Sequence, residues 1–243
     1  MVKKLIINAD DFGLCDGVSL GILTAHKKGI LTSTTCMMNM PDIRYHLEIA
    51  KNYPDLGLGV HLNITAGPAL TANSFSDENG NFFPRNHYPD FIPVVNKDEL
   101  YNEWKAQIER FIAMTGHMPT HLDSHHHIHL LPDYLPVALK LASEYHLPIR
   151  QEQYVQKQYE DVRFAEIFYN DTVSLQTIAD ICQFKDEIFE MMCHPAFVDK
   201  YLYTHSSYHL KRTDELEILC CDEVKDLTST VELINYSQIK KVK

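Results

Sequence analysis

Apolar runs of strand length alternate with stretches of helical period along most of the chain. Helices are predicted at about residues 16–28, 42–52, 96–116, 132–145, 175–184 and 210–221. Buried strands are predicted at about residues 5–9, 30–38, 56–64, 120–129 (a strand end with its loop), 148–151, 188–193 and 231–236. Alternation of this kind predicts an α/β fold with a parallel sheet curled into a barrel. Residues 152–173 show no clear pattern.

One predicted helix carries clear signals at both ends. Asn96, with Glu99 three residues later, resembles a capping box, and Gly116 closes the helix. The segment before it, residues 65–95, is rich in Gly, Pro, Asn and Asp and is therefore expected to be a loop. A loop of this length is usually functional, so we expect a lid or a substrate-binding loop.

The composition is that of an ordinary globular protein. Hydrophobic residues make up 45% of the 243 residues and charged residues 23%, which is enough for a real core. No repeat or linker divides the chain, so residues 1–243 are expected to form one domain. The N-terminal apolar stretch is too short for a secretory signal and no run reaches the length of a membrane span, which favours a cytoplasmic protein. The six cysteines show no CxxC pair and are expected to be reduced thiols.

The net charge limits the partners. It is −11 with histidine counted as neutral, which argues against nucleic acid, because phosphate backbones are bound by clustered Lys and Arg. A small ligand, phosphorylated or not, is compatible with this charge. Closed dimers are the commonest oligomers, so a homodimer is the default expectation.

Candidate catalytic residues stand where strands are predicted to end. They are Asp10, Asp11, His61, His194 and the histidine-rich segment 123–129. The carboxyl ends of parallel strands meet on one face of an α/β barrel, and active sites lie there. We therefore expect these distant residues to share one pocket.

Asp10 and Asp11 are adjacent carboxylates. Successive side chains of a strand point to opposite faces, but at a strand end both can reach one pocket, where one can hold a metal while the other accepts a proton from water. The alternative is a turn with a helix N-cap, a frequent role of Asp. Residues 11–13 also match the kinase DFG string, which we discount because the sequence has no glycine-rich loop before it and no HRD loop.

Histidine is the outlier of the composition, with 14 residues. Four of them lie within residues 125–129, between apolar positions, and a buried group of imidazoles is costly unless hydrogen-bonded or metal-bound. On an extended chain, every second residue from Asp123 to His129 shares one face. This favours a metal or catalytic role over a solvated polar tract.

Single histidines carry less information. His61 alone would be interpreted as a hydrogen-bonded core residue, and only the neighbouring clusters favour a functional role. His194 is compatible with a general acid, a residue that supports a ligand, or a plain loop residue. His205 and His209 have no third ligand nearby and are expected to be structural.

Five sequence blocks together resemble one known family. They are LIINADDFG at residues 5–13, LTSTT at 31–35, GVHL at 59–62, PTHLDSHHH at 119–127 and MCHPAF at 192–197. In this order they resemble the YdjC-type carbohydrate deacetylases, which include chitooligosaccharide deacetylases. The first and fourth blocks are specific in combination, and the resemblance is weakest in residues 65–115 and 150–185.

The resemblance implies a (β/α) barrel-like deacetylase fold, of the distorted or incomplete TIM type, and a divalent metal. It implies Asp11, His61 and His125 as the metal ligands and Asp10 as the catalytic base, with His127 left open in place of His125. The resemblance implies Mg²⁺, whereas an Asp-His-His set suits Zn²⁺ or another transition metal better.

The implied reaction is removal of an acetyl group from an N-acetylated sugar such as a chitooligosaccharide (diacetylchitobiose or its 6-phosphate), with release of acetate. In a matching mechanism Asp10 accepts a proton from water and His194 donates one to the leaving amine. Two rivals stay open: another metal-dependent barrel hydrolase (a phosphoesterase or an amidohydrolase), and a non-catalytic sugar-binding protein with aromatic side chains that stack on sugar faces. The aromatic residues of the long loop are Phe82, Phe83, Tyr88 and Phe91.

Overall fold

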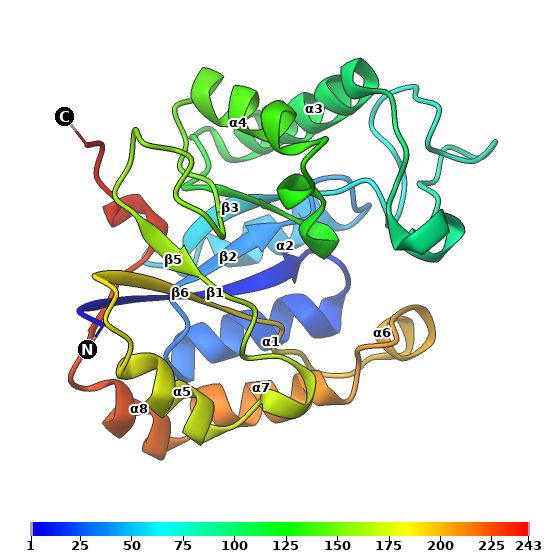
Figure 1. Cartoon of the computed structure of the whole chain (residues 1–243). Coiled ribbons are helices and arrows are strands. Elements are labelled where there is room, and N and C mark those ends of the chain that lie inside the picture. Colours follow the sequence, from blue (N-terminus) through cyan, green and yellow to red (C-terminus); the bar gives the residue numbers. More distant parts are fainter. Residues whose placement is uncertain (1, 243) are drawn as a thin grey trace.

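Seven strands form one curled sheet in the computed structural model, which describes residues 2–242. In sheet order they are β4 (Leu122–Ser124), β3 (Gly57–Leu62), β2 (Ser33–Cys36), β1 (Lys4–Phe12), β6 (Ile188–Cys193) and β5 (Val162–Phe164), with β7 (Glu232–Leu233) paired to the start of β1. Every ladder is parallel. The sheet curves without pairing its two edge strands β4 and β5 (Figure 1), so the predicted α/β barrel-like fold is confirmed in its incomplete form.

Helices lie on both sides of this sheet. They are α1 (Asp16–Lys28), α2 (Ile43–Ala50), α3 (Lys97–Thr115), α4 (Leu135–Glu144), α5 (Leu175–Cys182), α6 (Lys200–His205), α7 (Lys211–Cys220) and α8 (Asp222–Thr228). Short 3₁₀ turns are η1 (Arg85–His87), η2 (Pro89–Phe91), η3 (His125–Leu130), η4 (Asn170–Thr172) and η5 (Tyr236–Gln238). In Figure 1, α3 and α4 cover one side and α1, α5, α7 and α8 the other. None of the helices described is both long and apolar enough to cross a membrane.

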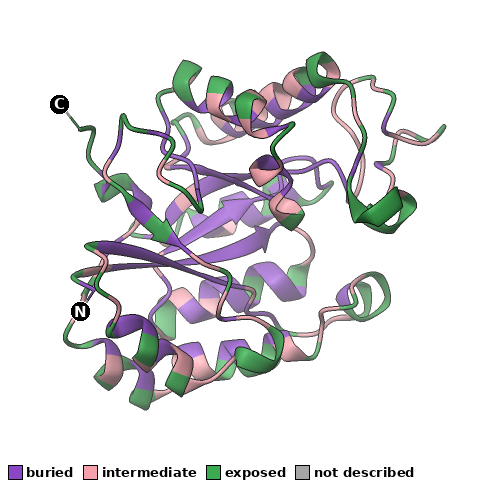
Figure 2. Cartoon of the chain, in the orientation of Figure 1, coloured by how far each residue is buried: buried purple, intermediate pink, exposed green. Residues whose placement is uncertain are grey.

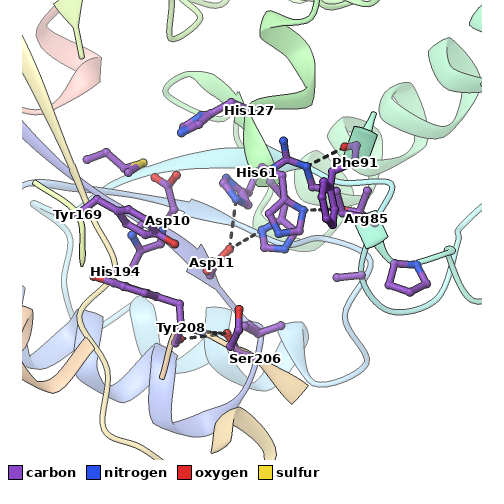
Figure 3. A pocket seen from close by; sticks show the side chains of 18 of the residues that line it. Asp10, Asp11, His61, Arg85, Phe91, His127, Tyr169, His194, Ser206 and Tyr208 are labelled. Carbon is purple, nitrogen blue, oxygen red and sulfur yellow. Dashed lines mark hydrogen bonds and ion pairs between the residues drawn. The ribbon is translucent and has the colours of Figure 1, made fainter. Parts of the chain in front are cut away.

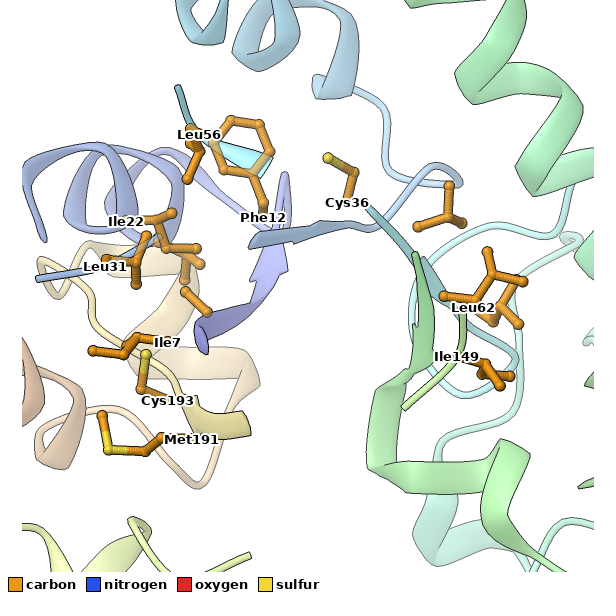
Figure 4. Packing of buried hydrophobic residues seen from close by; sticks show 14 of the residues in the cluster. Ile7, Phe12, Ile22, Leu31, Cys36, Leu56, Leu62, Ile149, Met191 and Cys193 are labelled. Carbon is orange, nitrogen blue, oxygen red and sulfur yellow. The ribbon is translucent and has the colours of Figure 1, made fainter. Parts of the chain in front are cut away.

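The core follows from burial of the sheet on both faces. Nearly every residue of β1 is buried, as expected for a parallel strand covered by helices. Figure 2 shows the strands buried and the outer helix faces exposed. Ile7, Met191 and Cys193 pack together on one side of the sheet, whereas Leu62 and Ile149 pack further along it (Figure 4). All six cysteines are free, as the sequence predicted.

The predicted caps of α3 are present, with one difference. The Asn96 side chain accepts hydrogen bonds from the backbone N–H groups of Asp98 and Glu99, and Gly116 ends the helix at a φ of 78°. The Glu99 carboxylate does not return to the cap. It accepts hydrogen bonds from the backbone N–H of Ser74 at 2.9 Å and from its hydroxyl at 2.6 Å. The capping-box glutamate therefore fastens the long loop to the helix.

The loop over residues 65–95 is confirmed, with only η1, η2 and isolated bridges inside its described backbone. Glu103 of α3 accepts hydrogen bonds from the N–H of Thr71 at 2.8 Å and from its hydroxyl at 2.7 Å. Phe75 and Phe82 are buried and stack with ring centroids 5.9 Å apart. The loop is thus a packed segment fixed on α3.

The strand end and loop expected at residues 120–129 are confirmed, but the histidines do not share one face as they would on an extended chain. β4 ends at Ser124, and η3 follows with His126 and His127 in the left-handed region at φ 57° and 54°. The Ser124 hydroxyl accepts a hydrogen bond from the N–H of His129 at 2.9 Å and closes this turn. The histidines consequently point in different directions.

Other differences concern short elements. The strand expected at 148–151 is reduced to one parallel bridge between Leu122 and Ile149. The unassigned stretch 152–173 contains β5 and η4, and the sequence pattern also missed α6 and α8. Elements of three to seven residues are too short to display a period.

Candidate active site

A bulge at the end of β1 brings two neighbouring carboxylates into one cavity. Ala9 pairs with Thr34 and Phe12 with Cys36, so three steps along β1 match two along β2. Asp11 occupies this irregularity at a φ of 72°. A bulge bends the strand and redirects its side chains, so Asp10 and Asp11 both line the cavity although they are adjacent.

The cavity lies at the carboxyl ends of the strands and has a volume of about 810 Å³. This is within the range of small-molecule sites, about 300–1,000 Å³. The candidates that line it are Asp10, Asp11, His61, His125, His127 and His194, together with η1, η2 and α6 residues (Figure 3). The predicted meeting of distant strand ends is therefore observed in the geometry.

Asp11, His61 and His125 lie in a compact cluster at the centre of the cavity (Figure 3). Asp11 Oδ1 is 2.9 Å from His125 Nδ1 and 3.3 Å from His61 Nε2, and it is buried without a hydrogen-bond partner. Two ligand atoms that share an ion at about 2.1 Å are roughly 3.0–3.4 Å apart for right-angle to tetrahedral geometry. The three donor atoms, one of which is the unpartnered Asp11 Oδ1, thus fit a divalent cation.

His61 is held in place from behind. Its Nδ1 lies 2.7 Å from Asp123 Oδ1, and the Thr35 hydroxyl donates to Asp123 Oδ2 at 2.9 Å. Burial by itself lowers the pKa of His61, but the charge of Asp123 and the nearby carboxylate of Asp11 outweigh it and raise the pKa to about 10. A carboxylate behind an imidazole fixes the ring orientation and directs the other nitrogen to a metal.

Arg212 fixes the second oxygen of Asp11. Its Nη2 donates to Asp11 Oδ2 at 2.7 Å. Burial alone would raise the pKa of Asp11, but the charges of His125 and Arg212 hold the pKa well below its ordinary value. Asp11 is therefore ionised, with one oxygen directed at the cluster.

Arg150 forms a bidentate ion pair with Asp10. Nη1 and Nη2 donate to the two carboxylate oxygens at 2.7 Å each, and Asn8 Nδ2 donates to Oδ1 at 2.9 Å. Burial acts to raise the pKa of Asp10, but Arg150 overcomes it and the pKa is lowered. The same guanidinium reaches Glu190 at 2.8 Å and Asp123 at 3.1 Å.

A second acidic group, Asp10, His61 and Asp123, also has ligand-like spacing. Both of its carboxylates are paired with Arg150. A fixed guanidinium supplies their counter-charge and would repel a second cation. Among the described residues, the geometry therefore favours one metal position.

His194 lies at the edge of the cavity between two tyrosines. Its ring meets Tyr169 and Tyr208 edge-on, at centroid distances of 5.6 and 5.7 Å, and its Nδ1 is buried without a partner. Its backbone N–H donates to the Glu215 carboxylate. Burial, followed by the charge of Arg212, lowers the pKa of His194 to about 4.

The remaining histidines of η3 have separate surroundings. His126 contacts the Thr65 hydroxyl at 3.0 Å, and His127 lies 3.9 Å from Glu166 on a cavity wall. His129 is buried, and its Nε2 is 3.1 Å from the Arg150 carbonyl oxygen. His125, not His127, completes the Asp-His-His cluster.

The site contains two arginines, Arg150 and Arg212, that were not predicted from the sequence. Arg150 follows the apolar residues 147–149, and Arg212 lies on the inward face of α7 together with Glu215 and Leu216. Each arginine stands at a position where the pattern predicts a buried apolar side chain. This could have indicated a functional role, because charged side chains are buried only when they are paired.

Comparisons with known proteins agree with this architecture. A family model described as YdjC-like protein matches residues 4–230. A carbohydrate deacetylase of Brevibacillus brevis is 38% identical over 250 residues, which cover 97% of this chain and 99% of that protein. A chitooligosaccharide deacetylase of Yersinia pestis is 38% identical over 238 residues, which cover 93% of this chain and 94% of that protein. A crystal structure of a cellobiose-phosphate cleavage protein from Enterococcus faecalis V583 has a TM-score of 0.86 at 35% identity, and the match covers 97% of this chain and 98% of that one.

The curled parallel sheet, with a cavity at its strand ends, places the chain among the α/β barrel-like enzymes. The chain belongs to the YdjC-like family. The resemblance carried by the five sequence blocks is therefore confirmed.

Proposed function

We propose that this protein is a metal-dependent carbohydrate N-deacetylase that hydrolyses the acetamide group of N-acetylated sugars such as chitooligosaccharides. Its general class is that of its family: it is a deacetylase and hence a hydrolase. The metal requirement and the substrate are the proposal. The observation that carries it is the unpartnered Asp11 Oδ1, enclosed by two imidazoles beside the ionised Asp10.

Asp11, His61 and His125 are the proposed metal ligands. A bound divalent cation would lower the pKa of a coordinated water and polarise the acetamide carbonyl. The donor set suits Zn²⁺, Mn²⁺, Fe²⁺ or Co²⁺ on softness grounds, and Mg²⁺ is the ion implied by the family resemblance. The chain prepares the site beforehand, because Asp123 orients His61 and Arg212 orients Asp11.

Asp10 is the proposed general base. Arg150 keeps its carboxylate ionised and fixed in orientation, so it is ready to accept a proton from the attacking water. A carboxylate of low pKa is a weak base. It suffices only for a water that is already acidified, which is consistent with a neighbouring cation.

His194 is the proposed proton donor to the leaving nitrogen. With a pKa of about 4 it is neutral in the resting site at pH 7, so it must gain a proton during the cycle. The proton that Asp10 removes from water is the natural source. Its transfer through His194 to nitrogen breaks the C–N bond, leaving the amino sugar and acetic acid, which ionises to acetate.

The substrate is proposed from the cavity and the relatives. One relative is named a chitooligosaccharide deacetylase, and the cavity is large enough for a ligand of small-molecule size. We therefore propose diacetylchitobiose, or its 6-phosphate, as the first compounds to assay.

The test is acetate release from N-acetylated chitooligosaccharides by protein loaded with Mg²⁺, Mn²⁺, Co²⁺ or Zn²⁺. We expect His125→Ala to lower kcat/KM more than about a thousandfold, because the several kcal/mol contributed by a catalytic metal would be lost. His127→Ala is the matched control and should still bind about one ion per chain. Metal content measured on both variants separates ligand loss from general damage.

Three results would overturn the proposal. Full acetate release after removal of all metal would exclude metal dependence. Two ions per chain with phosphate-ester hydrolysis would favour the rival phosphoesterase. Sugar binding without any acetate release would favour the rival binding protein.

A further inference from the structure

Two exposed aromatic rings stand on opposite rims of the cavity. Phe91 on η2 is 58% exposed, Tyr201 on α6 is 41% exposed, and both line the cavity. Figure 1 shows α6 and the teal loop that contains η2 facing each other beyond the end of β1, and Figure 3 shows Phe91 at the cavity edge. Because both rings are exposed and also line the cavity, they are accessible to a bound ligand.

The backbone that presents Phe91 is strained. Asp90 and Phe91 both have left-handed backbone conformations, at φ 52° and 58°. A bulky residue rarely adopts this conformation, and such strain clusters at ligand clamps. Arg85 Nε donates to the Phe91 carbonyl at 2.9 Å, which holds the turn in place. A strained backbone conformation thus keeps the apolar ring of Phe91 exposed to solvent beside the site.

One face of the Tyr201 ring is supported by His205. The two rings stack at a centroid distance of 4.3 Å and an interplanar angle of 13°. Asp199 caps α6 by accepting from the N–H of Leu202 at 2.8 Å, and it also accepts from the N–H of Gly17 at 2.8 Å. The helix is therefore tied to α1, which fixes the position of the Tyr201 ring at the cavity.

The other aromatic rings of the loop are already engaged. Phe75 and Phe82 stack on each other inside the loop, Phe83 stacks on His87 at 4.2 Å, and the Tyr88 ring meets His87 edge-on at 5.3 Å. Among the described loop residues, Phe91 is the aromatic side chain that lines the cavity. The aromatic contacts expected from the sequence are thereby reduced to one residue, and Tyr201 joins it from a helix that the sequence did not predict.

We propose that Phe91 and Tyr201 form a sugar clamp, a pair of aromatic walls that stack on pyranose rings flanking the ring whose acetamide reacts. The C–H faces of a pyranose are apolar and weakly positive, and they match the negative face of an aromatic ring. The centre of the cavity is charged and holds the reacting group, whereas the clamp binds neighbouring rings. The inference rests on the proposed function and adds the two residues that bind the rings next to the reacting one.

The test compares N-acetylglucosamine with its β-1,4-linked disaccharide and trisaccharide. For Phe91→Ala and Tyr201→Ala we expect the ratio of kcat/KM for trisaccharide over monosaccharide to fall about tenfold each, mainly through KM, as for loss of one good aromatic contact. Phe91→Tyr and Tyr201→Phe keep an aromatic face and should restore the ratio. Tyr203→Ala is the matched control, since Tyr203 lies on the same helix, is 60% exposed and is not among the residues that line the cavity.

Calorimetric titration with the trisaccharide separates this inference from the proposed function. Acetate release with an unchanged ratio in both alanine variants would leave the deacetylase standing and overturn the clamp. Absence of acetate release, together with binding that is weakened in Phe91→Ala and Tyr201→Ala but not in Tyr203→Ala, would overturn the deacetylase and support the clamp. Wild-type protein that binds and processes the monosaccharide as well as the trisaccharide would also refute the clamp.

Discussion

The floor and the rim of the cavity are built by different means. The floor consists of the strand-end residues Asp10, Asp11 and His61, each at most 2% exposed, and every one of them is fixed by a buried charged neighbour. The rim consists of η1, η2 and α6, where Phe91 and Tyr201 are largely exposed. Chemistry requires groups that do not move, whereas ring recognition requires surfaces that a large ligand can reach.

The two regions also differ in the source of their unfavourable free energy. On the floor, burying Asp10, Asp123 and Glu190 is offset by the single guanidinium of Arg150. On the rim, the cost is the left-handed backbone of Asp90 and Phe91. Substitutions should therefore have large, electrostatic effects on the floor and small, conformational effects on the rim.

Arg150→Met should produce the largest loss of stability. The substitution removes the ion pairs of Arg150 with the buried Asp10, Asp123 and Glu190, and breaking a buried ion pair costs about 3–5 kcal/mol. Urea unfolding should show this loss, or the variant should fail to fold. Arg85→Met on the rim is the matched control and should stay within about 0.5 kcal/mol of wild type. Equal effects of the two substitutions would remove the distinction between floor and rim.

The positions of the floor residues were predictable from the sequence because strand ends are. An apolar run marks a parallel strand, and the polar residues where the run ends mark its carboxyl end, which is how Asp10, His61 and His194 could be assigned to one face. The orientation of Asp11 was not predictable. It depends on a one-residue bulge in the ladder between β1 and β2, and a bulge has no period.

The support of the floor and the composition of the rim were harder to predict. Arg150 meets its carboxylates only after the chain has folded, because Arg150 and Asp10 are separated by 140 positions in the sequence. The alternation in the histidine-rich segment fits one face of an extended chain, yet the Ser124 hydroxyl closes a turn and residues 125–130 form η3. Which loop aromatic faces the cavity depends on stacking partners such as His87, which are set by tertiary packing.

Glu215→Gln should change how stability depends on pH. Burial raises the pKa of Glu215 from its ordinary 4.5 to about 7. The folded protein therefore keeps this proton to about pH 7 while the unfolded chain loses it near 4.5, so stability falls as pH rises through that window, by on the order of 3 kcal/mol. The Gln variant should have a flatter profile of unfolding free energy between these values. Parallel profiles for the two proteins would show that Glu215 is not protonated in the native state.

Asp123→Asn should weaken metal binding without removing it. Asp123 accepts from His61 Nδ1 at 2.7 Å, and loss of such an outer carboxylate lowers metal affinity about 10–100-fold. Calorimetric titration with Mg²⁺ and Zn²⁺ measures this effect. Asp133→Asn, an exposed carboxylate paired with Lys97, serves as control. An unchanged affinity in Asp123→Asn would mean that His61 needs no support from behind.

Asp90→Gly should have the smallest effect on stability and is the most informative change on the rim. Glycine tolerates a φ of 52° without strain but adds freedom to the unfolded chain, so the net change should stay within about 1 kcal/mol. The turn would then hold Phe91 less firmly, and the preference for trisaccharide over monosaccharide should fall about two- to fivefold, less than complete loss of an aromatic contact. Asp77→Gly, in the same loop away from the cavity lining, controls for loop softening. If Asp90→Gly left that preference unchanged, the strain at η2 would have no part in recognition, and rim and floor would differ only in exposure.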